Sequence, residues 1–197
     1  MLPTPVSAED LNIYGQADLP WDRVRKALDM AIGLPETAEF LGTVSPSGKP
    51  SSAGIGCVES DGHLYFTSGP ATRKSRNLAS NPDCTLSLRL PGVDLVLSGE
   101  ARQVTDTAEL DRVTAVYRAG GWPAERSGDE VTAPYSAQSA GPAPWHLYRF
   151  TIHSAVGVAL TDPHGATRWQ FAHRGMALSQ EHSDAPDDAT EVETPRS

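Results

Sequence analysis

Three cationic side chains gather at the start of one predicted helix. The pair Gly69-Pro70 breaks the chain after a strand-like segment, and Thr72 can then cap a helix that has Arg73, Lys74 and Arg76 in or near its first turn. Cations cost stability there, because a helix N-terminus carries about half a positive charge. Free backbone N–H groups with Arg and Lys side chains do bind phosphate. The pattern therefore predicts an anion site, and the alternative is a solvated basic patch on a surface turn.

The charge of the rest of the chain is acidic. The net charge is −9, and residues 181–197 hold six acidic side chains, one arginine and no aromatic residue, which is typical of disorder. We therefore predict an acidic disordered tail over residues 175–197. No basic stripe lies outside residues 73–76, which argues against a nucleic-acid partner. No segment resembles a membrane span or a signal peptide, so we expect a cytoplasmic protein with no membrane partner.

Other chemistries have little support in the residues. Cys57 and Cys84 each lie in an apolar, strand-like run, which predicts two buried thiols rather than a disulfide. The six histidines show no spacing typical of a metal site, and we expect no bound metal. The sequence has no Gly-x-Ser-x-Gly elbow and no Gly-rich loop between a strand and a helix. The motifs therefore do not favour a metalloenzyme, a serine hydrolase or a dinucleotide-binding fold.

The elements that must position the cationic turn are mostly short strands. Asp61-Gly62 between two alternating segments is a strong hairpin signal, and Cys84 to Leu90 alternates apolar with polar residues. Asp106 with Glu109 resembles a capping box at a helix start. The predicted strands are 39–44, 51–58, 63–68, 84–90, 93–104, 145–160 and 166–171, and the predicted helices are 20–32, 72–80 and 106–120.

The spacing of these elements favours an antiparallel barrel. A parallel sheet would need a helix after nearly every strand, and few helices are predicted here. We therefore expect a mainly β fold with flanking helices. Residues 1–19 form a weakly patterned N-terminal arm, and residues 20–174 form the barrel domain. Residues 122–144 are rich in Pro, Ser, Ala and Gly and are predicted to be a structured loop that shapes the mouth of a substrate site.

The order of the motifs resembles that of the pyridoxamine 5′-phosphate oxidase-like superfamily, the flavin-binding split barrels. The likeness covers roughly residues 20–171 and depends on the order and spacing of several motifs, none of them decisive alone. It implies a six-stranded antiparallel split β-barrel. The motifs are Phe40-Leu-Gly-Thr-Val44, Gly48-Lys-Pro50, Gly62-His-Leu-Tyr-Phe-Thr67, Thr72-Arg-Lys-Ser-Arg-Asn-Leu78 with Asn81-Pro82, Gly99-Glu-Ala101 and Gly165-Ala-Thr-Arg-Trp169.

The resemblance implies a cofactor, either FMN or the deazaflavin coenzyme F420, with its phosphate held by the basic turn. Lys74 and Asn77 match the Lys-x-x-Asn of the deazaflavin branch, whereas Arg73 with Lys74 matches the flavin branch, so the motif does not choose between them. The cofactor-binding residues that the resemblance implies are Thr43, Ser52, Ala53, Gly54, Thr67, Ser68, Arg73, Lys74, Asn77, Arg168 and Trp169.

Several of these residues have a simpler alternative role. The flat ring would lie against the backbone near Ser52, Ala53 and Gly54, where small residues allow close approach. The run Gly54-Ile55-Gly56 could instead be a bend of the barrel, and Thr43 and Thr67 could face either the groove or solvent. The sequence therefore leaves the wall of the ring site open.

The resemblance also implies a homodimer, with two cofactor sites between the subunits and a small-molecule substrate. True pyridoxamine-phosphate oxidases carry a C-terminal Trp followed by spaced Arg and His, whereas this chain reads Ala166-Thr-Arg-Trp-Gln-Phe171. The difference argues against the vitamin as substrate. Arg168 and Trp169 would then line the cofactor groove of the partner subunit, or Trp169 would close the barrel core.

The function expected from the resemblance is hydride transfer between FMN or F420 and an unidentified small organic substrate. No catalytic side chain is assigned, because in flavin-type enzymes the cofactor carries the hydride. One alternative is a non-catalytic cofactor-binding or carrier protein of the same fold. Another is a haem-handling protein, which is weakened by the lack of a clearly placed axial histidine.

Overall fold

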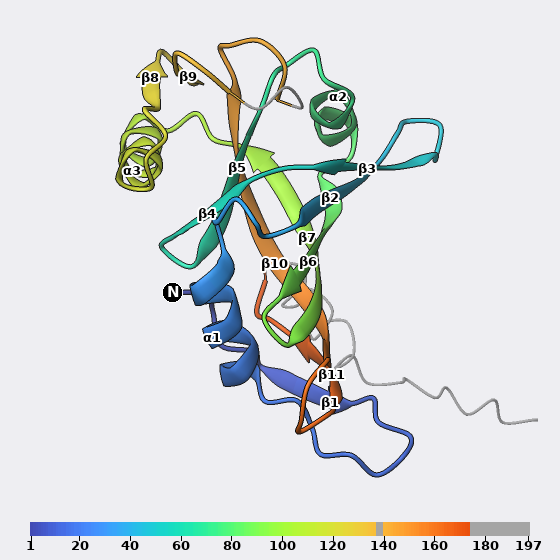
Figure 1. Ribbon diagram of the computed structural model, residues 1–197. Helices are drawn as coiled ribbons and strands as arrows, with labels where there is room; N and C mark the ends of the chain where they lie inside the picture. Colours follow the sequence, from blue (N-terminus) through green and yellow to red (C-terminus); the bar gives the residue numbers. More distant parts are fainter. Residues whose placement is uncertain (137–139, 174–197) are drawn as a thin grey trace, which may run out of the picture.

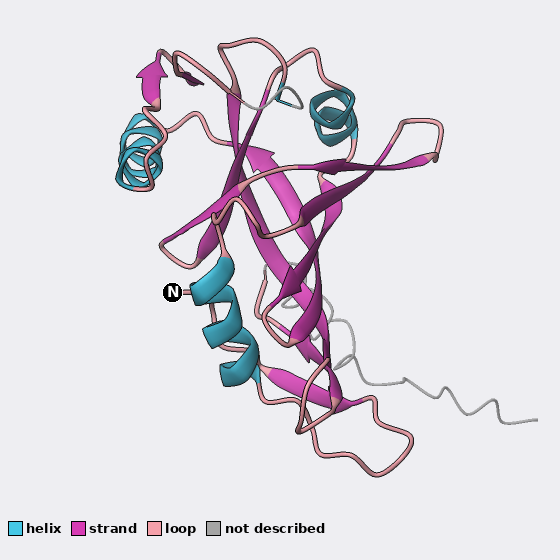
Figure 2. Ribbon diagram, viewed as in Figure 1, coloured by secondary structure: helices cyan, strands magenta, loops and turns pink. Residues whose placement is uncertain are grey.

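The computed structural model describes residues 1–136 and 140–173 of the 197-residue chain (Figure 1). The tail predicted over residues 175–197 lies outside the described residues. Strands dominate the described part, with three helices around them (Figure 2). The predicted fold class, mainly β with flanking helices, is therefore confirmed.

One large antiparallel sheet holds nine of the described strands, and a separate hairpin holds two. The sheet contains β1 (Ser7–Asp10), β2 (Glu39–Val44), β3 (Pro50–Gly54), β4 (Cys57–Ser60), β5 (His63–Ser68), β6 (Asp83–Leu90), β7 (Val93–Gln103), β10 (His146–Ala159) and β11 (Ala166–Gln170). The hairpin contains β8 (Glu125–Ser127) and β9 (Glu130–Thr132), which lie within the loop predicted over residues 122–144.

The central strands form a six-membered split barrel when β3 and β4 are counted as halves of one strand. Around the barrel, β3 pairs with β2, β2 with β6, β6 with β7, β7 with β10, β10 with β5, and β5 with β4. The ladder of strand pairs does not close between β3 and β4, where residues 55–56 carry the chain across instead. The single strand predicted over residues 51–58 is therefore two strands with different partners.

The longest strand, β10, connects the barrel to its extension. Its first residues pair with β5 and its later residues with β11, while β7 follows it on the other side. A bulge between Ile152 and Ser154 interrupts the pairing with β7 next to Gly99. The bulge lets one strand serve both parts of the sheet, because it changes the local twist without ending the ladder.

The N-terminal segment contributes a strand that the sequence analysis did not predict. Residues 7–10, expected to belong to an arm, pair antiparallel with β11 at the edge of the sheet. All four side chains of β1 are exposed, so the strand has no alternation that a pattern could detect. Leu2 is only 2% exposed and packs in the main core.

The three helices match their predicted positions closely. α1 (Trp21–Ala31) follows Pro20 and buries an apolar face, α2 (Arg73–Ser80) follows Thr72, and α3 (Thr107–Ala119) follows Asp106. The Asp106 carboxylate accepts a hydrogen bond from the Glu109 backbone N–H at 2.8 Å, as an N-cap does. In Figure 1, α2 and α3 lie at one end of the barrel and α1 lies beside its other end.

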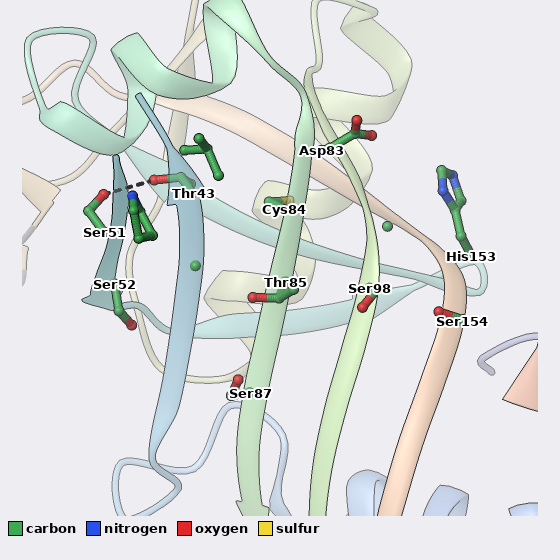
Figure 3. A pocket seen from close by; sticks show the side chains of 14 residues that line it. Thr43, Ser51, Ser52, Asp83, Cys84, Thr85, Ser87, Ser98, His153 and Ser154 are labelled. Atoms are coloured by element: carbon green, nitrogen blue, oxygen red, sulfur yellow. Dashed lines mark hydrogen bonds between the residues drawn. The ribbon is translucent and has the colours of Figure 1, made fainter. Parts of the chain in front are cut away.

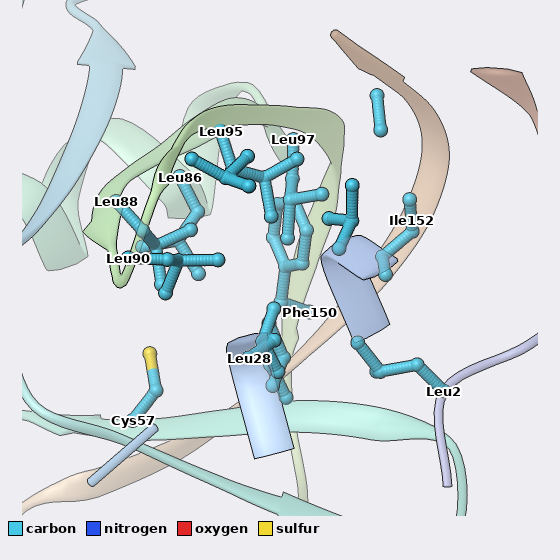
Figure 4. Packing of buried hydrophobic residues seen from close by; sticks show 14 of the residues in the cluster. Leu2, Leu28, Cys57, Leu86, Leu88, Leu90, Leu95, Leu97, Phe150 and Ile152 are labelled. Atoms are coloured by element: carbon cyan, nitrogen blue, oxygen red, sulfur yellow. The ribbon is translucent and has the colours of Figure 1, made fainter. Parts of the chain in front are cut away.

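Two hydrophobic clusters stabilise these elements. The main cluster fills the barrel with side chains from β6, β7 and β10 and continues onto α1 (Figure 4). Trp21 of α1 contacts Trp169 and Phe171 with ring centroids 5.2 and 5.0 Å apart. The smaller cluster joins α3 to β5 and β10 through Tyr65, Leu110 and neighbouring residues. Cys57 and Cys84 are buried free thiols, as predicted.

We predict that Gly99→Ala destabilises the fold, whereas Gly54→Ala does not. A Cβ at Gly99 would collide with the backbone carbonyl oxygen of Thr151 in the neighbouring strand, and a Cβ at Gly54 would meet nothing within 4 Å. Overpacking of this kind costs about 1–3 kcal/mol. Urea unfolding of both variants against the native chain measures the difference. Equal stability of the two variants would contradict the close packing at the bulge.

Candidate functional site

A large cavity of about 1160 Å³ opens where the two halves of the split strand meet the helices. Its lining comes from β2, β4, the loop after α1, the first turn of α2 and the end of α3, and includes Phe40, Ile55, Lys74, Tyr117 and Trp122. Cavities that bind small molecules usually measure about 300–1000 Å³ and are mainly apolar with a few polar groups. The large cavity is therefore of a size and character to hold a sizeable organic ligand.

Bare backbone forms one wall of the large cavity. Gly54, Ile55 and Gly56 line it at the point where the chain passes from β3 to β4. A Cβ added at Gly54 or Gly56 would meet nothing within 4 Å, so both glycines face open space. Residues 54–56 therefore contain the break between β3 and β4, and they also form a wall of the large cavity. The bend expected as an alternative to a ring site is present, and it lies at the cavity.

Glu39 holds this wall from the first residue of β2. Its Oε2 accepts a hydrogen bond from the Cys57 backbone N–H at 2.6 Å, and its Oε1 accepts one from Gly33 N–H at 3.3 Å. Its backbone oxygen accepts a third from Ile55 N–H at 3.1 Å. Glu39 is 4% exposed, and burial raises the pKa of its carboxyl group. The sequence analysis did not identify Glu39, because one acidic residue at a strand start has no distinguishing pattern.

The start of α2 presents one of its three cations to the large cavity. Lys74 lines the cavity and is 6% exposed, and burial lowers the pKa of its ammonium group. Arg73 and Arg76 are exposed, and Arg76 donates a hydrogen bond to the backbone oxygen of Ala71. Of the predicted basic cluster, Lys74 is therefore the member in the cavity.

Hydroxyl groups order the turn that precedes Lys74. Thr72 caps α2 by accepting a hydrogen bond from Ser75 N–H at 3.3 Å, as the sequence predicts. The Ser68 hydroxyl lies 2.8 Å from that of Thr72 and accepts from the Ser75 hydroxyl at 2.9 Å. Ser68 is thus buried support for the turn, while Thr67 beside it lines the large cavity.

A second hollow lies on the outer face of the sheet, beside two hydrogen-bond partners of Asn77. This outer hollow has a volume of about 780 Å³ and is lined by Thr43, Ser51 and Ser52 together with residues of β6, β7 and β10 (Figure 3). The Asn77 side-chain amide donates to the Thr43 hydroxyl at 2.9 Å and to the Ser51 hydroxyl at 3.3 Å. Asn77 therefore joins α2 to the β2–β3 hairpin rather than lining the large cavity.

The two hollows adjoin each other along the β2–β3 ladder. The register pair Phe40 and Gly54 lines the large cavity, and the next pair on the same face, Gly42 and Ser52, lines the outer hollow. Ala53 lies between these pairs, opposite Leu41. The predicted ring wall over residues 52–54 is therefore shared between the two hollows.

Arg168 and Trp169 lie at the other end of the sheet. Arg168 forms an ion pair with Glu9 of β1 at 2.7 Å, and Trp169 is 2% exposed in the main core. Trp169 therefore closes the core of its own subunit, which was one of the two roles considered for it. Neither residue lines either hollow.

Two aromatic residues of the large cavity were not among the predicted cofactor-binding residues. Trp122 packs edge-on against Tyr117 at 5.0 Å and lies 5.6 Å from Trp145, between ring centroids. Its indole N–H donates to the backbone oxygen of Tyr135 at 2.8 Å. Trp122 begins the segment 122–144 that is expected to shape the mouth of a substrate site, and it lines the large cavity.

The described residues include neither a candidate metal cluster nor a helix that could span a membrane. Among residues 1–136 and 140–173, no group of three or more His, Cys, Asp or Glu side chains could hold a metal ion. No described helix has both the length and the apolar character needed to cross a membrane.

Several solved structures share the fold of this chain. A pyridoxamine 5′-phosphate oxidase-related, FMN-binding protein from Nostoc punctiforme is 19% identical, with a TM-score of 0.51 over 77% of this chain and 91% of that one. PhzG from Burkholderia lata, solved with tetrahydrophenazine-1-carboxylic acid, is 18% identical, with a TM-score of 0.52 over 78% and 86%. A heme-binding protein from Mycobacterium smegmatis is 11% identical, with a TM-score of 0.51 over 76% and 58%. Likeness at these identities shows the fold alone.

The family assignment comes from the sequence of the barrel itself. No curated protein sequence matches the chain significantly. The family model of pyridoxamine 5′-phosphate oxidase matches residues 34–158, which is more than half of the chain and runs from the loop after α1 to the end of β10. The chain therefore belongs to the pyridoxamine 5′-phosphate oxidase family.

Proposed function

We propose that this chain is a cytoplasmic, homodimeric oxidoreductase that binds FMN or F420 and transfers a hydride between that cofactor and a small organic substrate. One observation carries the proposal. The bare backbone of Gly54 and Gly56 and the buried ammonium of Lys74 line the same cavity. The glycine backbone would allow a flat ring to approach closely, and the Lys74 ammonium would attract a phosphate.

The residues present fit such a ligand. Neither Gly54 nor Gly56 carries a Cβ, and the space in front of both is open, so a planar ring can approach the backbone closely there. A phosphate beside Lys74 would favour its charged form, which burial alone disfavours. Among the described lining residues Lys74 is the cation, whereas Asp29, Glu39 and Glu59 are acidic. The phosphate of the ligand would therefore lie next to Lys74, away from the acidic residues.

The chain itself would bind the ligand, orient it and exclude water from it. When bound, the ring supplies the hydride chemistry. Tyr117 and Trp122 would cover apolar surface of the ligand and keep water from it, and Lys74 would fix its orientation from the opposite end. The fold is used by proteins with different functions, so the site rather than the fold supports this assignment.

We predict that the purified protein carries the visible absorption of a flavin or of a deazaflavin. The FMN spectrum lies in the blue and that of a deazaflavin at shorter wavelength, whereas haem would give a Soret band. No histidine lies among the described residues that line the large cavity, which disfavours haem there. Turnover with the loaded protein then separates an enzyme from a carrier. A protein that binds neither FMN nor F420 on reconstitution would contradict the proposal.

We predict that Lys74→Ala weakens cofactor binding by about 1.5–3 kcal/mol, the usual value of a hydrogen bond to a charged group. Arg76→Ala is the matched control, because it removes the same charge from the same helix at an exposed position. Fluorescence titration with FMN and with F420 measures both variants. Equal loss in the two variants would show that only the general field of α2 matters.

The homodimer is proposed to form through the outer face of the barrel. Phe40, Ser87, Val96 and Val156 are successive register partners across β2, β6, β7 and β10, so they share one face. Phe40 is 50% and Val96 is 41% exposed, which is unusual for apolar side chains in the middle of a sheet. A second copy related by a two-fold axis would cover this row and the adjoining cavity mouths.

We predict that Val96→Asp converts the dimer to monomer, because it places a charge in the centre of this face. Ile13→Asp is the control, since Ile13 is similarly apolar and more exposed but lies in the loop after β1. Sedimentation velocity gives the mass of each variant. A native chain that sediments as a monomer, or a Val96→Asp variant that remains dimeric, would overturn the proposed interface.

A further inference from the structure

At the split between β3 and β4, the carboxylate and the backbone oxygen of Glu39 in β2 accept hydrogen bonds from two backbone N–H groups. These are Cys57 N–H and Ile55 N–H, on either side of Gly56. At this point the pairing of the chain with β2 ends and its pairing with β5 begins. Buried backbone donors need partners, because an unpaired donor costs about 1–3 kcal/mol. Glu39 provides both partners, one with its side chain and one with its backbone oxygen.

Both oxygens of the Glu39 carboxylate are used as acceptors. Oε2 receives Cys57 N–H at 2.6 Å, and Oε1 receives Gly33 N–H at 3.3 Å from the loop after α1. The carboxylate therefore joins the two sides of the large cavity that Gly56 and Gly33 line. A neutral carboxyl group or an amide has one acceptor of this kind and would present a donor to the other N–H group.

We propose that Glu39 is a positioning residue that holds the glycine wall of the large cavity in its ligand-binding shape only while its carboxylate is ionised. The proposal rests on the proposed function, since it concerns binding at the same wall. Ligand binding would then depend on proton release from a group that does not touch the ligand. Binding should weaken as pH falls, because a proton on one oxygen removes one of the two N–H contacts.

The groups that face Glu39 leave it as the residue that titrates in this region. The thiol of Cys57 and the phenol of Tyr117 both have pKa values raised by burial and by neighbouring negative charge, so they stay neutral at ordinary pH. Burial raises the pKa of the Glu39 carboxyl group itself. The charged groups on elements around it also include Asp29 of α1 and Lys74 of α2. Glu59 of β4 pairs with the N-terminal ammonium, and Arg89 of β6 pairs with Asp94.

The test compares the native chain with Glu39→Gln. Glu36→Gln is the matched control, because Glu36 is exposed in the loop just before β2 and does not line the large cavity. The probe is lumiflavin, which has the ring and no phosphate that would titrate. As pH falls through the pKa of Glu39, we expect its affinity for the native chain and for Glu36→Gln to fall about fivefold, the loss of one ordinary hydrogen bond. Glu39→Gln should bind more weakly at pH 8, with no such pH dependence.

Two ligand-free measurements accompany the titration. Amide exchange followed by NMR should show reduced protection of Gly33 or Cys57 in Glu39→Gln and not in Glu36→Gln. Because the folded-state pKa of Glu39 is raised, its ionisation costs stability as pH rises through that value, and Glu39→Gln should remove this dependence of the unfolding free energy.

The outcomes separate this proposal from the function on which it rests. Native protection at both amides in Glu39→Gln, or the native pH dependence of lumiflavin binding in that variant, overturns the role of Glu39. Failure of the native chain to bind lumiflavin at any pH overturns the proposed ring site itself, and the coupling with it. Loss of protection together with loss of the pH dependence supports the proposal.

Discussion

The constraint on which the large cavity depends is the exchange of strand partners at residues 55–56. β3 pairs with β2 and β4 pairs with β5, so the ladder of strand pairs is interrupted at this point. The parted backbone is buried beside a cavity, where its polar groups need partners other than a neighbouring strand. The Glu39 backbone oxygen accepts from Ile55 N–H, and its carboxylate accepts from Cys57 N–H at the cost of burying a charge.

The large cavity is accordingly built from two buried charges of opposite sign. Lys74 enters from α2 and Glu39 lies at the start of β2, and burial disfavours the charged form of each. Such groups are retained where they perform a task that an apolar residue could not. For Lys74 that task is the proposed hold on an anion, and for Glu39 it is the shape of the wall. Between them the lining is largely apolar, as a planar organic ligand requires.

Membership of the pyridoxamine 5′-phosphate oxidase family fits this architecture without naming a substrate. The barrel end that reads Ala166-Thr-Arg-Trp-Gln-Phe171 is engaged internally, because Arg168 pairs with Glu9 and Trp169 contacts Trp21. These residues stabilise β1 and α1 against the sheet. In its own subunit the segment therefore contributes to the fold, with Arg168 on the surface and Trp169 in the core.

The sequence by itself determined the class of fold, the helices and most strands, because alternation, caps and turn residues are local signals. Thr72 and Asp106 are N-caps as predicted, and the Asp61-Gly62 hairpin joins β4 to β5. Local signals could not show β1, whose side chains are all exposed, or the break at residues 55–56, which reflects pairing with distant strands.

Only the tertiary structure decided which cation enters the cavity, since Arg73, Lys74 and Arg76 are equivalent in sequence and differ in the direction they take from α2. It also directed Asn77 to Thr43 rather than to the large cavity and brought Glu39 to Cys57, eighteen residues away. Such contacts depend on how strands cross rather than on spacing along the chain.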